Sequence, residues 1–140
     1  MATNAFAVKT ALRDMAKSLP ELSGYQVTYG FPVRSPQKRW VFIGEVVWED
    51  SQWATNRSRE EVFSVAAVIN CQISGATSED VERELQRMAE GIENGLKANP
   101  SLGIDTVATT DFVPKKLVSF PSDQTYEGQL ECLLRVKARL

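Results

Sequence analysis

Five carboxylates gather in the first half of the chain, where they could do acid–base chemistry or hold a hard cation. Glu45, Glu49 and Asp50 lie close together, and Glu60 and Glu61 follow. Their spacing does not match a calcium-binding loop, and exposed acids are common at the ends of strands. The pattern therefore favours solvated acids over a metal or catalytic site.

The other reactive groups offer little catalytic chemistry. The 140 residues include no histidine, which removes Ser-His-Asp and Cys-His catalysis, and the two cysteines are too few for a four-thiolate zinc site. Cys71 and Cys132 both fall on the apolar side of an alternating segment, so we expect buried, slowly reacting thiols. The sequence contains no Gly-rich phosphate-binding motif. We therefore predict a protein that is not an enzyme and that binds no cofactor or metal.

Tryptophans and local basic clusters mark the candidate contact surfaces. Trp48 ends an apolar segment and is expected in the core, whereas Trp53 lies in a polar segment and either folds back on the core or anchors a partner. Basic side chains cluster at four places, which are Lys9, Arg13 and Lys17; Arg34, Lys38 and Arg39; Lys115 and Lys116; and Arg135, Lys137 and Arg139. The first cluster is either a solvated edge of a helix or a surface that meets a partner, and the last is either a solvated face or a salt-sensitive protein contact.

The spacing of apolar residues predicts the elements that must position these groups. From Phe63 to Ile73 every second residue is apolar, which indicates a strand with one buried face. Gly44 suggests a bulge or a close backbone approach in the strand before it. The predicted elements are helix 4–19, strands 25–31, 40–48 and 59–73, helix 78–97, one or two strands within 104–120 interrupted at Pro114, and a final strand 126–140.

The helix over 78–97 has the clearest signals. Thr77 or Ser78 can cap its start, with Asp80 near the third position, and acidic residues crowd the first turns, where the helix dipole favours them. Polar loops are expected over 32–39, 49–58 and 113–124. The element order predicts an α+β fold, a mostly antiparallel sheet with two helices packed on one face, in one domain spanning 1–140.

Composition restricts the partners. The net charge is −2, so the strong basic excess that usually accompanies nonspecific nucleic-acid or membrane binding is missing. No apolar run approaches the roughly 18 residues of a membrane span. The first residues lack the charged and apolar regions of a signal peptide, and the two unpaired cysteines suggest a reducing compartment.

The size and the order of these elements resemble the tail terminator proteins of tailed bacteriophages. The resemblance is centred on the segments Trp40–Trp48 and Arg59–Ile73, with the polar Trp/Asn loop and Arg59-Glu60-Glu61 between and beside them, and on the long final strand. It covers nearly the whole chain. It transfers no individual residue, so candidate interface residues are inferred from their chemistry.

The resemblance implies structural work in a virion. Proteins of this family form a ring, typically of six subunits, on the end of the completed tail tube, stop its polymerisation and offer a surface to the head-side connector. The implied partners are further copies of the chain, the tail tube protein and the head–tail connector or stopper protein. Genome DNA can pass through the lumen, but sequence-specific nucleic-acid binding and membrane binding are not implied. The implied location is the virion tail, assembled in the cytoplasm of a bacterial host.

A closed ring needs two different patches that meet around the axis. The acidic start of helix 78–97 with the Glu60-Glu61 pair supplies one sign, and the basic clusters outside helix 4–19 supply the other. The candidate subunit or tail-tube interface residues are Arg34, Lys38, Arg39, Trp53, Arg57, Arg59, Glu60, Lys115 and Lys116. The three polar loops are the expected contacts with the lumen and the tube.

Three other functions stay open at this point. The chain could be another neck or connector protein of similar size, a small dimeric ferredoxin-like enzyme or ligand-binding domain, or a regulatory interaction domain. The oligomeric state separates them, since a ring of about six favours the terminator and a tight dimer favours the last two.

Overall fold

The computed structural model describes residues 3–30, 38–49, 52–53 and 59–139, with the backbone alone at Gln52, Trp53 and Arg59. Its helices are α1 (Ala5–Ser18), the short 3-10 helix η1 (Pro20–Leu22) and α2 (Ser78–Ala98). Its strands are β1 (Gln26–Tyr29), β2 (Arg39–Trp48), β3 (Gln52–Trp53), β4 (Arg59–Ser74), β5 (Val107–Ser122) and β6 (Thr125–Arg139).

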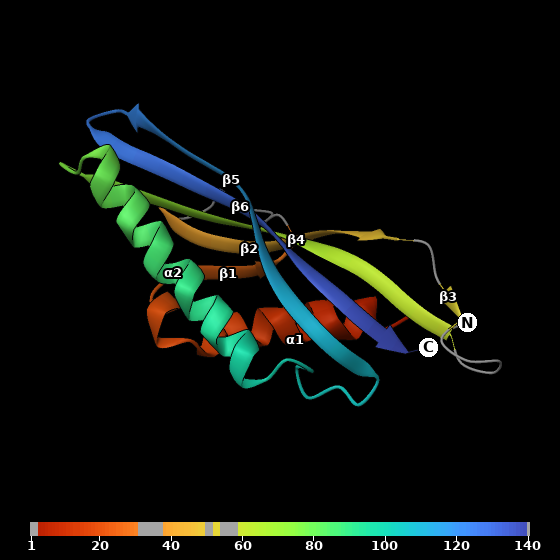
Figure 1. Cartoon of the computed structure of the whole chain (residues 1–140). Coiled ribbons are helices and arrows are strands. Elements are labelled where there is room, and N and C mark those ends of the chain that lie inside the picture. Colours follow the sequence, from red (N-terminus) through yellow and green to blue (C-terminus); the bar gives the residue numbers. More distant parts are fainter. Residues whose placement is uncertain (1–2, 31–37, 50–51, 54–58, 140) are drawn as a thin grey trace.

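The strands form one sheet in the order β1-β2-β4-β6-β5, and β3 pairs only with the start of β4. The β1–β2 pairing is parallel and all the others are antiparallel. Both helices lie on one face of this sheet, α1 against β1 and β2, and α2 against β4, β5 and β6 (Figure 1). The expected α+β architecture is confirmed.

The hydrophobic core lies between the helices and the sheet. The alternating apolar side chains of β4 all point to the helix side, where Phe63, Val65 and Ile69 are fully buried. Leu12 of α1 and Leu85 of α2 pack onto them. Each such side chain contributes about 1.5–3 kcal/mol on burial, so this layer holds the helices in place.

Local signals place α2 within a residue of its expected ends. The Thr77 hydroxyl accepts a hydrogen bond from Asp80 N at 3.3 Å, and the Asp80 carboxylate accepts one from Thr77 N at 3.0 Å, which completes a capping box. Gly128 of β6 lies directly under α2, where a Cβ atom would collide with Val81 and Leu85. The missing side chain lets the helix approach the sheet closely.

Three expectations about loops and strands need correction. The segment 113–124, expected as a loop, is mostly strand, because β5 runs unbroken through Pro114 with a register shift between Pro114 and Lys116. The proline is tolerated because β5 is an edge strand, where a missing N–H need not break a ladder. The polar segment 49–58 contains the two-residue strand β3, and strand 25–31 shortens to Gln26–Tyr29. The predicted bulge at Gly44 is confirmed by a register shift between Ile43 and Val46.

Candidate assembly surfaces

A buried carboxylate ties the start of the chain to the sheet. Glu61 of β4 is 2% exposed and accepts hydrogen bonds from Thr3 Oγ1, from Asn4 N at 3.0 Å, from Asn4 Nδ2 at 3.2 Å and from Trp48 Nε1 at 2.9 Å. Burial raises the pKa of Glu61, but these four hydrogen bonds together outweigh burial, so its pKa lies below the ordinary value. The carboxylate also faces the first turn of α1, where the helix dipole stabilises negative charge.

This arrangement corrects two sequence predictions. Glu61 is not half of an acidic surface patch with Glu60, because neighbouring residues of a strand point to opposite faces. Trp48 is not in the core: 47% of its surface is exposed, and its ring packs tilted against Phe63 with the ring centroids 6.3 Å apart. Trp48 is therefore exposed at the edge of the helix side of the sheet, and its neighbour Val47, 56% exposed, lies on the opposite face.

The outer side of α1 combines an exposed aromatic ring with cations. Phe6 is 67% exposed, the largest exposure of any large apolar side chain among the described residues. Arg13 and Lys17 follow it at intervals of seven and four residues, which places all three on one side of the helix. Lys9 lies over the ring of Tyr29, 4.1 Å from the ring centroid, and extends this surface to strand β1. We call Phe6, Lys9, Arg13 and Lys17 the α1 ridge.

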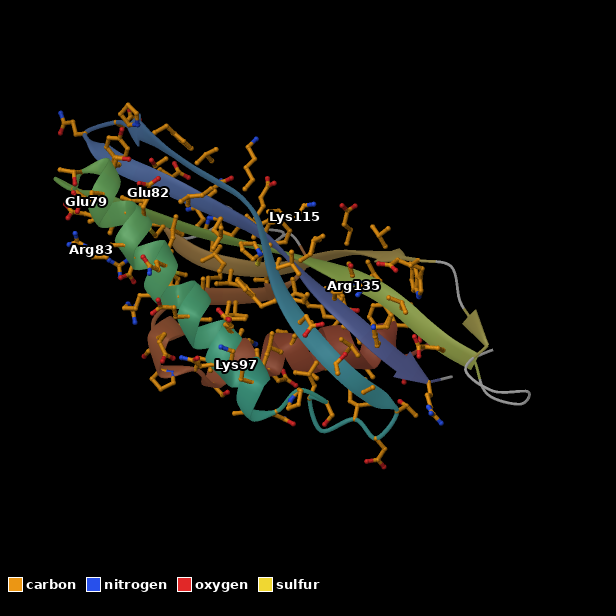
Figure 2. All side chains as sticks on the ribbon, viewed as in Figure 1. Glu79, Glu82, Arg83, Lys97, Lys115 and Arg135 are labelled. Atoms are coloured by element: carbon orange, nitrogen blue, oxygen red, sulfur yellow. The ribbon has the colours of Figure 1, made fainter. Side chains whose placement is uncertain are left out.

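A groove runs between α2 and the edge strand β5. Its cavity measures about 590 Å³, and its floor is apolar, formed by Leu85, Ala89, Phe112, Pro114, Leu117 and Leu130. Its rim on α2 carries four carboxylates, Glu79, Glu82, Glu90 and Glu93. Glu79 forms an ion pair with Arg83 at 2.7 Å and Glu93 one with Lys97 at 3.3 Å, so Glu82 and Glu90 carry the acidic character of the rim. Figure 2 shows Glu79, Glu82 and Arg83 along the exposed side of α2. We call this feature the α2–β5 groove.

The face of the sheet opposite the helices carries a shallow apolar hollow. Gly44 and Ala66 form its floor, Phe42 and Leu133 flank it, and Lys115 lies at its edge, in a space of about 440 Å³. Figure 2 shows Lys115 over β5 on the side away from α2. Glu45 and Glu131 also line this hollow, so the open face presents small and apolar side chains with charged residues around them.

An ion pair crosses the open face nearer the chain ends. Arg135 donates from Nε and Nη2 to the two carboxylate oxygens of Glu49, at 3.1 and 3.2 Å. The hydrogen bond from Arg135 lowers the pKa of Glu49. Glu49, one of the five carboxylates considered for chemistry, therefore has a structural partner.

The structure places the predicted interface residues on several surfaces instead of one patch. Lys38, Lys115 and Lys116 are exposed, and Glu60 is half-buried at the start of β4. Arg39 is half exposed, 3.9 Å from Glu84 in an ion pair, with its guanidinium over the ring of Tyr25. Arg34 and Arg57 lie outside the described residues, as do the side chains of Trp53 and Arg59.

Other groups considered for chemistry have structural roles. Cys71 and Cys132 are buried, as predicted, and burial raises their pKa to about 11 and about 12. No cluster of three or more metal-ligating side chains occurs within the described ranges. None of the helices in the part of the chain that the structure covers is long and apolar enough to cross a membrane.

Sequence reasoning missed Phe6, the α2–β5 groove and the role of Glu61. A signal existed for Glu61, because the alternation of Phe63 and Val65 extends back to it and puts it on the buried face. Phe6 precedes the apolar face of α1 at Val8 and Leu12, so the helical period already excluded it from the core. The groove had no local signal, because it forms between segments that are distant in sequence.

Comparisons with known proteins identify the fold. No protein-family model matches the sequence, and no curated protein matches it. Among solved structures, the chain is similar to a chain of a particle described as the virion of a native gene transfer agent. The two share 14% sequence identity with a TM-score of 0.68, over 99% of this chain and 100% of that chain. At this identity the likeness shows a common fold from end to end.

Proposed function

We propose that the chain is a structural protein of a phage-like virion, and specifically a tail terminator. In this proposal about six copies form a ring on the end of the tail tube, stop its polymerisation and provide the attachment surface for the head connector. The observation that carries it is the end-to-end fold similarity to a chain of a gene transfer agent virion, with a TM-score of 0.68. The same order of helices and strands carries the resemblance to tail terminators.

The surfaces of the chain support assembly. Phe6, Trp48, Leu117 and Phe120 are large apolar side chains that are 39–67% exposed, and charged residues flank several of them. Apolar anchors surrounded by polar residues are the usual composition of protein–protein contacts. The tail tube protein and the head connector are the further partners in this proposal, and the virion tail is the location.

A second candidate is another neck protein of the same virion. The fold similarity to a virion chain favours it equally, because that likeness does not distinguish positions along the head–tail axis. The two functions differ in what limits tail length. A terminator stops the tube, whereas a connector joins a tube that has already stopped.

Tail length therefore tests the proposal. The gene would be deleted from the genome that encodes it, and particles would be imaged by electron microscopy, with the gene supplied in trans as the control. We expect tubes of irregular and excessive length without heads, and normal tails on complementation. Tails of normal length without heads would support the connector function instead, and intact particles would contradict both.

A further inference from the structure

The α2–β5 groove and the α1 ridge are complementary in shape and charge. The groove has an apolar floor at Leu117 and Phe112 and an acidic rim that includes Glu82 and Glu90. The ridge has one exposed aromatic ring, and α1 carries three cations against the single carboxylate of Asp14. An aromatic anchor with adjacent cations is the chemistry that such a groove would accept.

The two features also match in length. Eleven residues separate Phe6 from Lys17, which spans about 16 Å along a helix, and fourteen separate Glu79 from Glu93, which spans about 21 Å. The rim is therefore long enough to face the whole ridge. Phe6 would then lie over the apolar floor while Arg13 and Lys17 lie against the carboxylates.

Their positions suit a ring. The ridge belongs to the β1 side of the sheet and the groove to the β5 side, at opposite ends of the strand order. Two different patches on opposite sides of a subunit generate a head-to-tail contact, which closes into a ring when the rotation allows it. The same patch could not serve both neighbours.

We propose that the α2–β5 groove of one copy binds the α1 ridge of the next, with Phe6 as the apolar anchor. This inference rests on the proposed ring function and names the contact that closes the ring. A second copy of this chain is the occupant, because the chain itself carries the complementary surface.

Direct pairing of edge strands is the competing geometry, and β5 is poorly suited to it. Pro114 lacks an N–H, the register shifts between Pro114 and Lys116, and Lys115 and Lys116 place two charges on the edge. Proline, bulges and lysines are the devices by which natural edge strands avoid pairing. The groove beside this edge is therefore the better contact.

A charge-exchange experiment tests the contact. One variant carries E82K and E90K in the groove, and the other carries R13E and K17E on the ridge. Each variant alone brings like charges together, and we expect its self-association to weaken about 100-fold or more. When the two are mixed, each groove meets a ridge of opposite charge, so the mixture should restore an alternating ring with equal numbers of both subunits, measured by native mass spectrometry.

Two further variants make the result specific. Phe6→Ala should weaken association about 30-fold or more, as truncation of an apolar interface anchor does. The control K137E/R139E makes the same change in net charge as R13E/K17E, but on the open face of the sheet, and it should assemble like the wild type. Circular dichroism confirms that each variant is folded.

Several outcomes would overturn the contact. These are rings formed by either charge variant alone, folded charge variants whose mixture stays dissociated, and a wild-type protein that stays monomeric up to about 1 mM. They leave the proposed function standing, because tail length after gene deletion tests that separately. Tails of normal length would instead reject the terminator function whatever the contact.

Discussion

Replacing Glu61 by glutamine should destabilise the fold far more than the same change at its neighbour Glu60. Both substitutions remove one negative charge and keep the side-chain size. Glu61 is 2% exposed and accepts four hydrogen bonds, two from Asn4 and one each from Thr3 and Trp48. Glu60 is half-buried on the opposite face of the sheet.

The magnitude follows from these hydrogen bonds. Bonds to a charged acceptor contribute about 1.5–3 kcal/mol each. Glutamine retains one acceptor oxygen, but its amide group faces donors, so about two bonds are lost and the cost is about 3–6 kcal/mol. For a domain of this size that corresponds to a melting temperature lower by roughly 10–20 °C. The Glu60→Gln control should stay within about 0.5 kcal/mol of wild type.

The difference in unfolding free energy between the wild type and Glu61→Gln should become smaller at low pH. Because the pKa of Glu61 lies below the ordinary value of 4.5, its charged form contributes stability above that pH, and the contribution is lost as the pH falls through the lower folded-state pKa. Urea unfolding at pH 7 and at about pH 3 measures this. The gap between wild type and Glu61→Gln should narrow at the lower pH. Glu61 would not hold the start of α1 to the sheet if Glu61→Gln lowered the free energy of unfolding no more than Glu60→Gln does. The same conclusion would follow if the loss caused by Glu61→Gln did not change with pH.

Further predictions concern packing, thiols, capping and salt. Gly128→Ala should lower the free energy of unfolding by about 1–3 kcal/mol, because the new methyl group collides with Val81 under α2; an unchanged urea midpoint would contradict this contact. Cys71 and Cys132, with pKa values near 11 and 12, should label with a thiol reagent only after denaturation, and fast native labelling would show that they are accessible. Thr77→Ala should cost about 1 kcal/mol through loss of the capping box, whereas no loss in thermal unfolding would mean that the cap contributes nothing. Subunit association should weaken as salt rises toward 1 M, where the Debye length is about 3 Å, and light scattering that is indifferent to salt would point to a purely apolar contact.

The sequence predicted the elements well wherever one periodic face was buried. The alternation at Phe63 and Val65 and the helical period at Val81 and Leu85 each follow from a single side packing on the core, so the strand and the helix lie where expected. Capping at Thr77 was also predictable, because its partner Asp80 is only three residues away.

The errors occurred where neighbours distant in sequence decide the outcome. Trp48 ends an apolar segment, yet no described element covers it fully, and its indole N–H reaches Glu61 instead. Pro114 was expected to interrupt a strand, but an edge position with a register shift accommodates it. Neither the edge position of β5 nor the identity of the element that lies beside Trp48 can be read from the local sequence pattern.

The candidate surfaces were predicted less completely than the fold. Lys115 and Lys116 are exposed as expected, but Arg39 already has an intramolecular partner in Glu84. The α2–β5 groove depends on the distance between a helix and an edge strand, which no sequence period encodes. The candidate assembly surfaces can be identified only once the packing of both helices on the sheet is known.

Native mass spectrometry of the purified protein, across a concentration series and with isolated tail tubes added, tests whether the chain forms a ring. A tail terminator should give one closed species of about six subunits, free or bound to the tube end. A tight dimer as the largest species, with no binding to tubes, would contradict the ring and favour the ligand-binding or regulatory alternatives.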